Sequence, residues 1–290
     1  MSGMDPVDEQ SAGLCCVLEP ILATSGIDDP ATAAHLGIQA ILPAVITLRA
    51  LQEEPGLRPW HGLLHRRCRI CPADDGAAPS TIDTRTRAGW RLVRTRTAVG
   101  AGRAGERWPD GVVVVHDLAR RLDDDDSTAL RAPRPLPAVQ NSSDSPGPPG
   151  PPVRSAPADA RARGPGGPTG SRGPKGPGNG RAVLVSALDI AAWSRAGGDC
   201  NRLHLIPGVA RAAGLRAGRD DVIAHGLLLA AVSLALIPAG DSAVDLRMRA
   251  PLPVPVIAGP HGARPPDARV LVEEPTGALI AGGRPVLQRV

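Results

Sequence analysis

The fold is decided by one apolar segment, Ile223-Ala224-His225-Gly226-Leu227-Leu228-Leu229-Ala230-Ala231-Val232-Ser233-Leu234-Ala235-Leu236-Ile237. Its side chains are apolar around the whole circumference of a helix, so we expect a helix over 223–237 that is buried on every side. Asp220 and Asp221 stand just before it, where short polar side chains commonly cap helices. The sequence therefore predicts a core helix in the second half of the chain.

The residues after this helix change to a period of two. In Val244-Asp245-Leu246-Arg247-Met248 the apolar residues alternate with charged ones, which indicates a half-buried strand. Further strands are predicted over 254–258, 269–273, 278–281 and 285–290. One buried helix followed by several antiparallel strands favours an α+β fold in which a curled sheet wraps around the helix.

The residues before the core helix predict two shorter helices. Ser186 can cap a helix over 187–196, with Leu188, Ala191 and Ala192 on one side, and Gly197-Gly198 ends it. A polar loop follows, and then a short helix over 207–214.

The first half of the chain shows a fainter version of the same order. An apolar helical segment covers 31–52, where Pro43 is expected to break the helix or to start a second one. Strands are predicted over 90–99 and 111–116. This order predicts a duplicated architecture, with two similar units in one chain.

Residues 133–180 separate the two halves and are rich in Pro, Gly, Ser, Ala and Arg. Glycine recurs at every third position from 164 to 176, but about five triplets are too few for a collagen triple helix. We therefore expect an N-terminal unit over 1–132, a disordered linker over 133–180 and a C-terminal unit over 181–290.

The composition narrows the class of protein. The 290 residues include no Phe, no Tyr and only four Trp, so the core must consist of Leu, Val, Ile and Ala. The net charge of +4 comes from scattered Arg residues interleaved with acids, without the aromatic-studded basic patch of a single-strand-binding surface, so no nucleic-acid partner is expected. An acidic, polar N-terminus, no apolar run of about 18 residues and an odd number of Cys predict a cytoplasmic protein without a membrane span.

The segment Gly198-Asp199-Cys200-Asn201-Arg202-Leu203-His204 carries the candidate chemistry. Asp199 offers a carboxylate and His204 a base that titrates near neutral pH, so together they can hold and activate one water molecule. The Asn201 amide can orient the loop or a ligand. Taken alone, the same segment is also compatible with an ordinary polar loop after a helix.

The start of the core helix offers a second candidate feature. The N–H groups of a helix N-terminus carry partial positive charge, and Gly226 would allow a substrate carbonyl to approach them closely. His225 is expected at the edge of that pocket or in a structural role. Alternatively, Gly226 is a small residue in the first turn of a core helix.

A metal site is not expected. Cys68 and Cys71 with His65 have a spacing seen in metal sites, but the sequence contains no second pair of cysteines at that spacing.

Taken together, these segments resemble the signature of the MaoC-like (R)-specific enoyl-thioester hydratases and dehydratases: Gly198-Asp199-x-Asn201-x-x-His204, then Pro207, Ala210 and Gly214-Leu215, then Ile223-Ala224-His225-Gly226. The resemblance implies the hot-dog fold, an antiparallel sheet wrapped around a central helix. It also implies two hot-dog repeats, of which the degenerate first one shapes the acyl pocket.

The resemblance further implies a reversible hydro-lyase of fatty-acid or polyketide metabolism, which hydrates a trans-2-enoyl thioester or dehydrates a (3R)-3-hydroxyacyl thioester. Asp199 and His204 would be catalytic, Gly226 would bind the thioester oxygen, and Asn201 and His225 would support substrate binding. The partner would be an acyl-CoA or an acyl-carrier-protein thioester, with no other cofactor, and a homodimer is compatible with this assignment. The alternative is a non-catalytic hot-dog module that binds acyl thioesters or a partner subunit.

Overall fold

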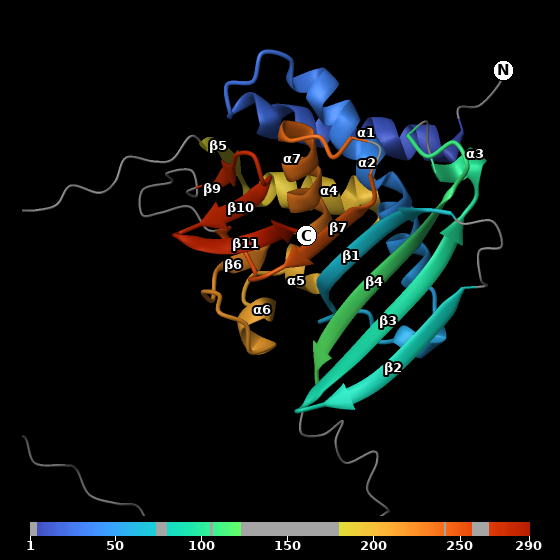
Figure 1. The fold of residues 1–290 in the computed structure, drawn as a ribbon. Coiled ribbons are helices and arrows are strands. Elements are labelled where there is room, and N and C mark those ends of the chain that lie inside the picture. Colours follow the sequence, from blue (N-terminus) through green and yellow to red (C-terminus); the bar gives the residue numbers. More distant parts are fainter. Residues whose placement is uncertain (1–4, 74–79, 105–106, 123–179, 241, 257–266) are drawn as a thin grey trace, which may run out of the picture.

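A nine-stranded antiparallel sheet, with helices against one face, forms the centre of the molecule (Figure 1). The computed structural model describes residues 5–73, 80–104, 107–122, 180–240, 242–256 and 267–290. Except for Gly180, the segment expected to be a linker lies outside the described residues.

The strand order of the sheet is β2-β3-β4-β1-β7-β11-β10-β9-β5. The first half of the chain supplies β1 (Leu64–Pro72), β2 (Thr81–Arg87), β3 (Trp90–Val99) and β4 (Val112–Arg121). The second half supplies β5 (Gly180–Val185), β7 (Val244–Met248), β9 (Ala268–Glu273), β10 (Ala278–Ala281) and β11 (Arg284–Arg289).

The two halves join where β1 pairs with β7. Cys68 lies opposite Leu246 in this antiparallel pair, and Arg67 of β1 forms an ion pair with Asp245 of β7. Hydrogen bonds therefore run without a break from the strands of one half to those of the other.

Helices α2 (Pro30–Leu51) and α7 (Gly226–Leu236) pack directly against each other. Their contact passes over Gly37, where an added Cβ would lie 2.7 Å from the carbonyl oxygen of Ala231 and 2.8 Å from the Cβ of Ala235. Each half thus contributes one long apolar helix, as the sequence predicted, and a glycine lets the two backbones approach closely.

The core helix begins three residues later than expected. Its first residue is Gly226, and residues 221–223 form strand β6 (Asp221–Ile223), which pairs with β8 (Pro253–Pro255). The carboxylate of Asp221 accepts a hydrogen bond of 2.6 Å from the backbone N–H of Gly218. The prediction that Asp220 and Asp221 cap the helix is therefore wrong, because strand pairing takes these residues before the helix begins.

Pro43 does not interrupt α2, contrary to expectation. The helix runs through it for 22 residues and buries Pro43 together with its apolar neighbours. Burial on both sides of this helix outweighs the lost backbone hydrogen bond, which costs about 3 kcal/mol. By length and composition α2 is apolar enough to cross a membrane, but 67% of its most apolar 18-residue stretch is buried inside the fold.

Helix α4 (Ala187–Gly197) confirms the predicted cap but presents a different face to the core. The Ser186 hydroxyl accepts a hydrogen bond from the backbone N–H of Asp189, and the Asp189 carboxylate accepts one from the Ser186 N–H. Leu188, expected on the apolar side, is 76% exposed. The buried face consists instead of Ile190, Trp193, Ser194 and Gly197.

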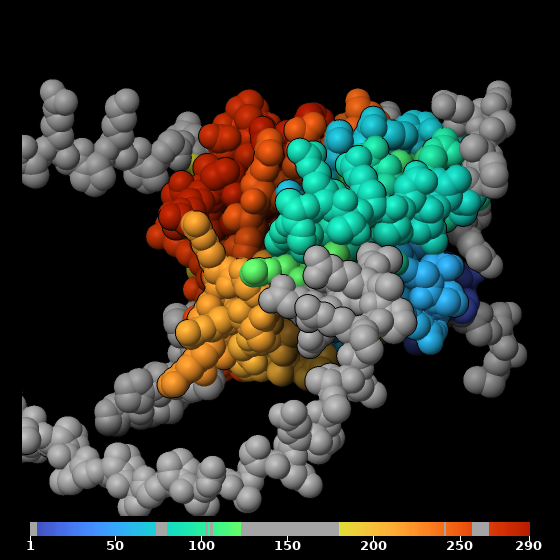
Figure 2. Space-filling model, turned by 90° about the horizontal axis from the view of Figure 1, so that it is seen from below, coloured from blue at the N-terminus to red at the C-terminus, as the bar shows by residue number. Residues whose placement is uncertain are grey.

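The segment after α4 is more helical than the loop predicted there. Residues 202–205 form the single-turn helix α5 (Arg202–Leu205), and the expected helix over 207–214 shortens to α6 (Val209–Ala212). Figure 2 shows this segment, in gold and orange, at the surface beside the green end of β4. Gly214 lies against the Arg121 side chain there.

Several elements of the first half had not been predicted. Helix α1 (Pro6–Ala23) begins after Asp5, whose carboxylate accepts a hydrogen bond of 2.8 Å from Val7 N–H; this cap and the proline after it are signals of a helix start that the prediction missed. The arginines of β1 and the exposed polar side chains of β2 obscured the alternation expected of strands. The short helices α3 (Ala101–Ala104) and η1 (Pro55–Leu57) complete this half.

Candidate functional site

Asp199 is placed by the end of helix α4. Gly198 ends that helix in a left-handed conformation with φ of +71°, and the Asp199 N–H donates to the Ser194 carbonyl oxygen at 3.0 Å. One carboxylate oxygen, Oδ1, accepts hydrogen bonds from Trp60 Nε1 at 3.1 Å and from the Asn201 N–H at 3.0 Å. These donors leave the second oxygen, Oδ2, directed toward two histidines.

Asn201 holds the candidate loop against the first half of the chain. Its Oδ1 accepts from the N–H groups of Gly62 and Leu203, at 3.2 and 3.3 Å, and its Nδ2 donates to the Leu63 carbonyl at 2.8 Å. The residue is 2% exposed, and both polar atoms of its amide have protein partners. Of the two roles considered for it, the structure favours orienting the loop.

His204 lies on α5, which places its ring near Asp199. Its Nδ1 is 2.7 Å from the carbonyl oxygen of Ile223, an acceptor, so Nδ1 carries the proton. Its Nε2 is 3.8 Å from Asp199 Oδ2. The sequence placed these two groups together, and the structure brings them together on α5 and the end of α4.

His225 lies deeper in the site than expected. Its Nδ1 is 3.2 Å from Asp199 Oδ2, its Nε2 is 2.7 Å from the Ser194 hydroxyl, and its ring stacks on that of His204 at 3.6 Å between centroids. Since a carboxylate only accepts, Nδ1 donates to Asp199 and Nε2 accepts from Ser194. Both ring nitrogens of His225 therefore have protein partners.

The two pKa values of the candidate pair move in the same direction. Burial alone would raise the pKa of Asp199, but the hydrogen bond from His225 and the charges of His225 and His204 outweigh burial and lower it. Burial lowers the pKa of His204 to about 3, and His225 adds to that effect. At neutral pH the site therefore holds a carboxylate beside a neutral imidazole.

A cavity of about 320 Å³ opens beside this pair. Its wall comes from both halves of the chain, including Leu48, Trp60, Leu63, Leu229, Met248 and Val286. Gly226 begins α7 at this wall, and no N-cap side chain bonds to the first turn. A Cβ at Gly226 would lie 3.0 Å from the Met248 side chain, so a larger residue would fit here only if Met248 moved.

No protein-family model and no curated protein matches the sequence. Among solved structures, a MaoC-like dehydratase superposes with a TM-score of 0.52 at 17% identity, over 97% of this chain and 91% of that one. The chain has the MaoC-like hot-dog fold.

Two further structures are similar. HtdX from Mycobacterium tuberculosis gives a TM-score of 0.48 at 19% identity, over 96% of this chain and 94% of that one. A MaoC-like dehydratase from Phytophthora capsici gives 0.47 at 15% identity, over 94% and 89%. The superposition at a TM-score of 0.52 confirms the prediction of an α+β hot-dog fold.

Two residues of the site in this MaoC-like fold had not been predicted, Trp60 and Ser194. Ser194 carried a signal that could have found it, since it is a polar residue on the face of α4 that is buried with Ile190 and Trp193. Nothing in the local sequence marks Trp60, because its partner Asp199 lies 139 positions further along the chain.

The low pKa of His204 leads to a prediction about acid stability. Below its ordinary pKa of 6.5 the unfolded chain takes up a proton at this residue, whereas the folded chain does not until the pH approaches about 3. The free energy of unfolding therefore decreases as the pH is lowered through this window, by up to about 1.4 kcal/mol per pH unit from this group. Urea unfolding of His204→Gln between about pH 6.5 and pH 4 is expected to show a shallower slope than the unmutated protein, and an equal slope would contradict the prediction.

Proposed function

We propose that the chain is a hydro-lyase that adds water reversibly to a trans-2-enoyl thioester, or removes it from a (3R)-3-hydroxyacyl thioester. The observation that carries the proposal is the pair Asp199 Oδ2 and His204 Nε2, 3.8 Å apart at the cavity beside the start of α7.

The protonation states of this pair favour binding of a water molecule. His204 carries its proton on Nδ1, so its Nε2 and Asp199 Oδ2 are both acceptors, and two acceptors at this separation repel each other. A water molecule within about 2.8 Å of each can donate one hydrogen to each atom. Its oxygen lone pairs then remain available to attack a substrate carbon.

In hydration, the water oxygen forms a bond to C3 of the enoyl thioester while one of its protons passes to the Asp199–His204 pair. A proton returns from the pair to C2, and dehydration reverses these steps. The enolate oxygen that develops in between would accept hydrogen bonds from the free N–H groups at Gly226. No redox cofactor or metal is needed for this step, because the thioester makes the C2 proton acidic.

The mouth of the cavity favours an anionic carrier. Arg49, Arg66 and Arg249 are exposed and line it. Three guanidinium groups suit the phosphates of coenzyme A or of an acyl-carrier protein. We infer that the acyl chain enters the apolar part of the cavity, with the thioester at Gly226, and that the enzyme acts in cytoplasmic fatty-acid or polyketide metabolism.

A second candidate is a non-catalytic hot-dog module that binds acyl thioesters. The observation that favours it is the low pKa of both Asp199 and His204, since groups of low pKa are weak general bases near neutral pH.

One assay separates the two candidates. The purified chain is mixed with trans-2-enoyl-CoA of increasing length, starting from crotonyl-CoA, and loss of the enoyl absorbance is followed while binding is measured by calorimetry. The hydro-lyase predicts saturable loss of absorbance and formation of the (3R)-hydroxyacyl product. Binding without turnover at every chain length would reject the hydro-lyase and support the module, and absence of both would reject both.

A further inference from the structure

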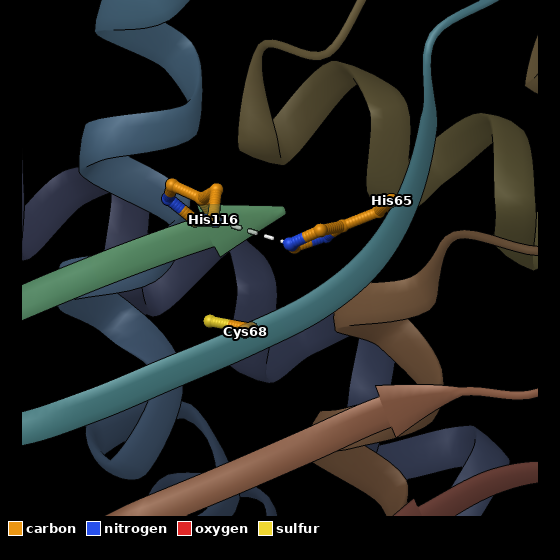
Figure 3. A group of neighbouring side chains, drawn as sticks. All are labelled: His65, Cys68 and His116. Atoms are coloured by element: carbon orange, nitrogen blue, oxygen red, sulfur yellow. Dashed lines mark hydrogen bonds between the residues drawn. The ribbon is translucent and has the colours of Figure 1, made fainter. Parts of the chain in front are cut away.

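We propose that His65, Cys68 and His116 form a binding site for a thiophilic transition-metal ion such as Zn²⁺. The site shares no residue with the Asp199–His204 pair, although His65 also lines the cavity beside that pair. Figure 3 shows the three side chains converging from β1 and β4. One ligating atom from each residue lies within 4.8 Å of the other two. The inference does not depend on the proposed hydro-lyase activity.

A β-bulge brings the three residues to one side of the sheet. His65 and Cys68 are three positions apart, so a regular strand would point them to opposite faces. The register of β1 against β4 shifts between His65 and Arg67, which adds one residue and returns both side chains to the same face. His116 lies directly opposite Cys68 in this strand pair.

The same geometry excludes the cysteine pair that the sequence suggested. From Arg67 to Pro72 the register is regular, so Cys68 and Cys71 face opposite sides of β1. Cys68 is fully buried, whereas Cys71 is half-buried. A Cys-x-x-Cys ligand pair is therefore ruled out, and His116, remote in sequence, takes the place of Cys71.

The distances suit tetrahedral coordination. His65 Nε2 and His116 Nδ1 are 3.0 Å apart. Two nitrogens that each lie about 2.0–2.1 Å from a zinc ion at tetrahedral angles are about 3.4 Å apart, so a shift of a few tenths of an ångström would admit the ion. Two imidazoles and one thiolate are a ligand set that favours zinc and copper over magnesium or calcium.

A hydrogen bond already fixes the ring of His116 in the required tautomer. The Thr47 hydroxyl is 2.9 Å from the Pro43 carbonyl, to which it donates, so its oxygen accepts from His116 Nε2–H at 2.8 Å. The lone pair of His116 is thus on Nδ1, toward His65 and Cys68. A ligating histidine held through its other nitrogen is the usual arrangement in metal sites.

The remaining two ligands differ: His65 already offers a neutral ring, whereas Cys68 has to lose its proton on binding. Burial lowers the pKa of His65 to about 4, so its imidazole is neutral, and metal binding at Nε2 would move its proton to Nδ1, which has no hydrogen-bond partner among the described residues. Burial raises the pKa of the Cys68 thiol. Binding of Zn²⁺ therefore forms a Zn–S bond and releases one proton from Cys68 to solvent.

The surrounding charges partly compensate the ion. One thiolate and two neutral imidazoles leave a net charge of +1 on a bound Zn²⁺. The negative charge of Asp117 acts on both His65 and Cys68. That of Asp199 acts on His65, and that of Asp245 acts on Cys68. All three carboxylates favour a cation at this place.

The test uses the purified full-length chain, stripped with a chelator and titrated with Zn²⁺ against a chromophoric competitor. We expect about one Zn²⁺ per chain in addition to any bound elsewhere, and a rise in Tm on zinc addition. Co²⁺ in place of Zn²⁺ should give the absorption of a tetrahedral ion together with a sulfur-to-cobalt charge-transfer band. That band requires a thiolate ligand, so it is read in the unmutated protein even if a variant fails to fold.

Four variants assign the site. Cys68→Ser and His116→Gln should weaken Zn²⁺ binding by about 100-fold or more and abolish the zinc-induced rise in Tm. Cys71→Ser, the matched control on the other face of β1, and His35→Ala, at an exposed histidine of α2, should leave both readouts unchanged. Zinc binding that survives Cys68→Ser, loss of binding in Cys71→Ser, or cobalt spectra without a charge-transfer band would each overturn the proposal.

Discussion

Asp199→Asn and His204→Ala are expected to lower the rate of enoyl-thioester hydration by about 10²- to 10⁴-fold, the usual contribution of a positioned acid–base group. In Asp199→Asn the amide oxygen can still accept from Trp60 and from the Asn201 N–H. The amide nitrogen, however, can no longer accept a hydrogen from water. In His204→Ala the acceptor Nε2 is absent, so the water would be held at one end only.

The measurement is kcat/KM for crotonyl-CoA, with thermal unfolding as a check that each variant is folded. Asp199→Asn keeps the size of the side chain, and His225 can change tautomer to accept from the new amide while donating to Ser194. His35→Ala, on the exposed side of α2, is the matched histidine control and should keep the full rate. Near-normal hydration in either site variant would reject the assignment of the pair.

The second large effect concerns the contact between α2 and α7. Gly37→Ala should lower the free energy of unfolding by about 1–3 kcal/mol, the usual cost of overpacking. The new methyl group would meet the carbonyl oxygen of Ala231 at 2.7 Å, and a backbone atom inside a packed helix cannot move aside cheaply. The cost should exceed the gain of about 1 kcal/mol that alanine brings to an isolated helix.

Gly13→Ala is the control for this prediction. Gly13 lies in the middle of α1, and a Cβ there meets only the Cβ of Ala196 at 3.6 Å, an ordinary contact. Its substitution should therefore raise the free energy of unfolding by up to about 1 kcal/mol. Denaturant unfolding of both variants gives the comparison, and a Gly37→Ala variant as stable as Gly13→Ala would contradict the packing seen here.

The sequence predicted those parts of the fold in which the pattern is local. The core helix, the strands over 90–99 and 278–281, and the Ser186 cap are confirmed because period and capping depend on neighbouring residues. Strand β1 was not predicted, because four residues of Leu64–Pro72 are arginines or histidine, which hide an apolar period of two, and a bulge breaks its alternation. The start of α7 was misjudged because pairing of β6 with β8 is a tertiary contact.

The candidate site likewise has one part that the local sequence predicts and another part that it does not. The approach of Asp199 and His204 follows from a spacing of five residues that the chain itself fixes. The partners that orient them, Trp60 and the backbone of Gly62 and Leu63, lie 138 or 139 positions away and became visible only with the fold. Likewise, His116 had no relation to Cys68 until the two strands were placed side by side.

The hydrogen bonds that tie the loop at Asp199 and Asn201 to Trp60, Gly62 and Leu63 have a consequence for any attempt to express the two halves as separate polypeptides. The carboxylate would come from one product and its indole donor from the other, so the working arrangement would form only on encounter. The fraction of assembled sites would then depend on protein concentration. In one continuous polypeptide that fraction is set by the high effective concentration of the two covalently linked halves. Dilution of such a split protein should abolish its binding of acyl thioesters, whereas dilution of the intact protein should not.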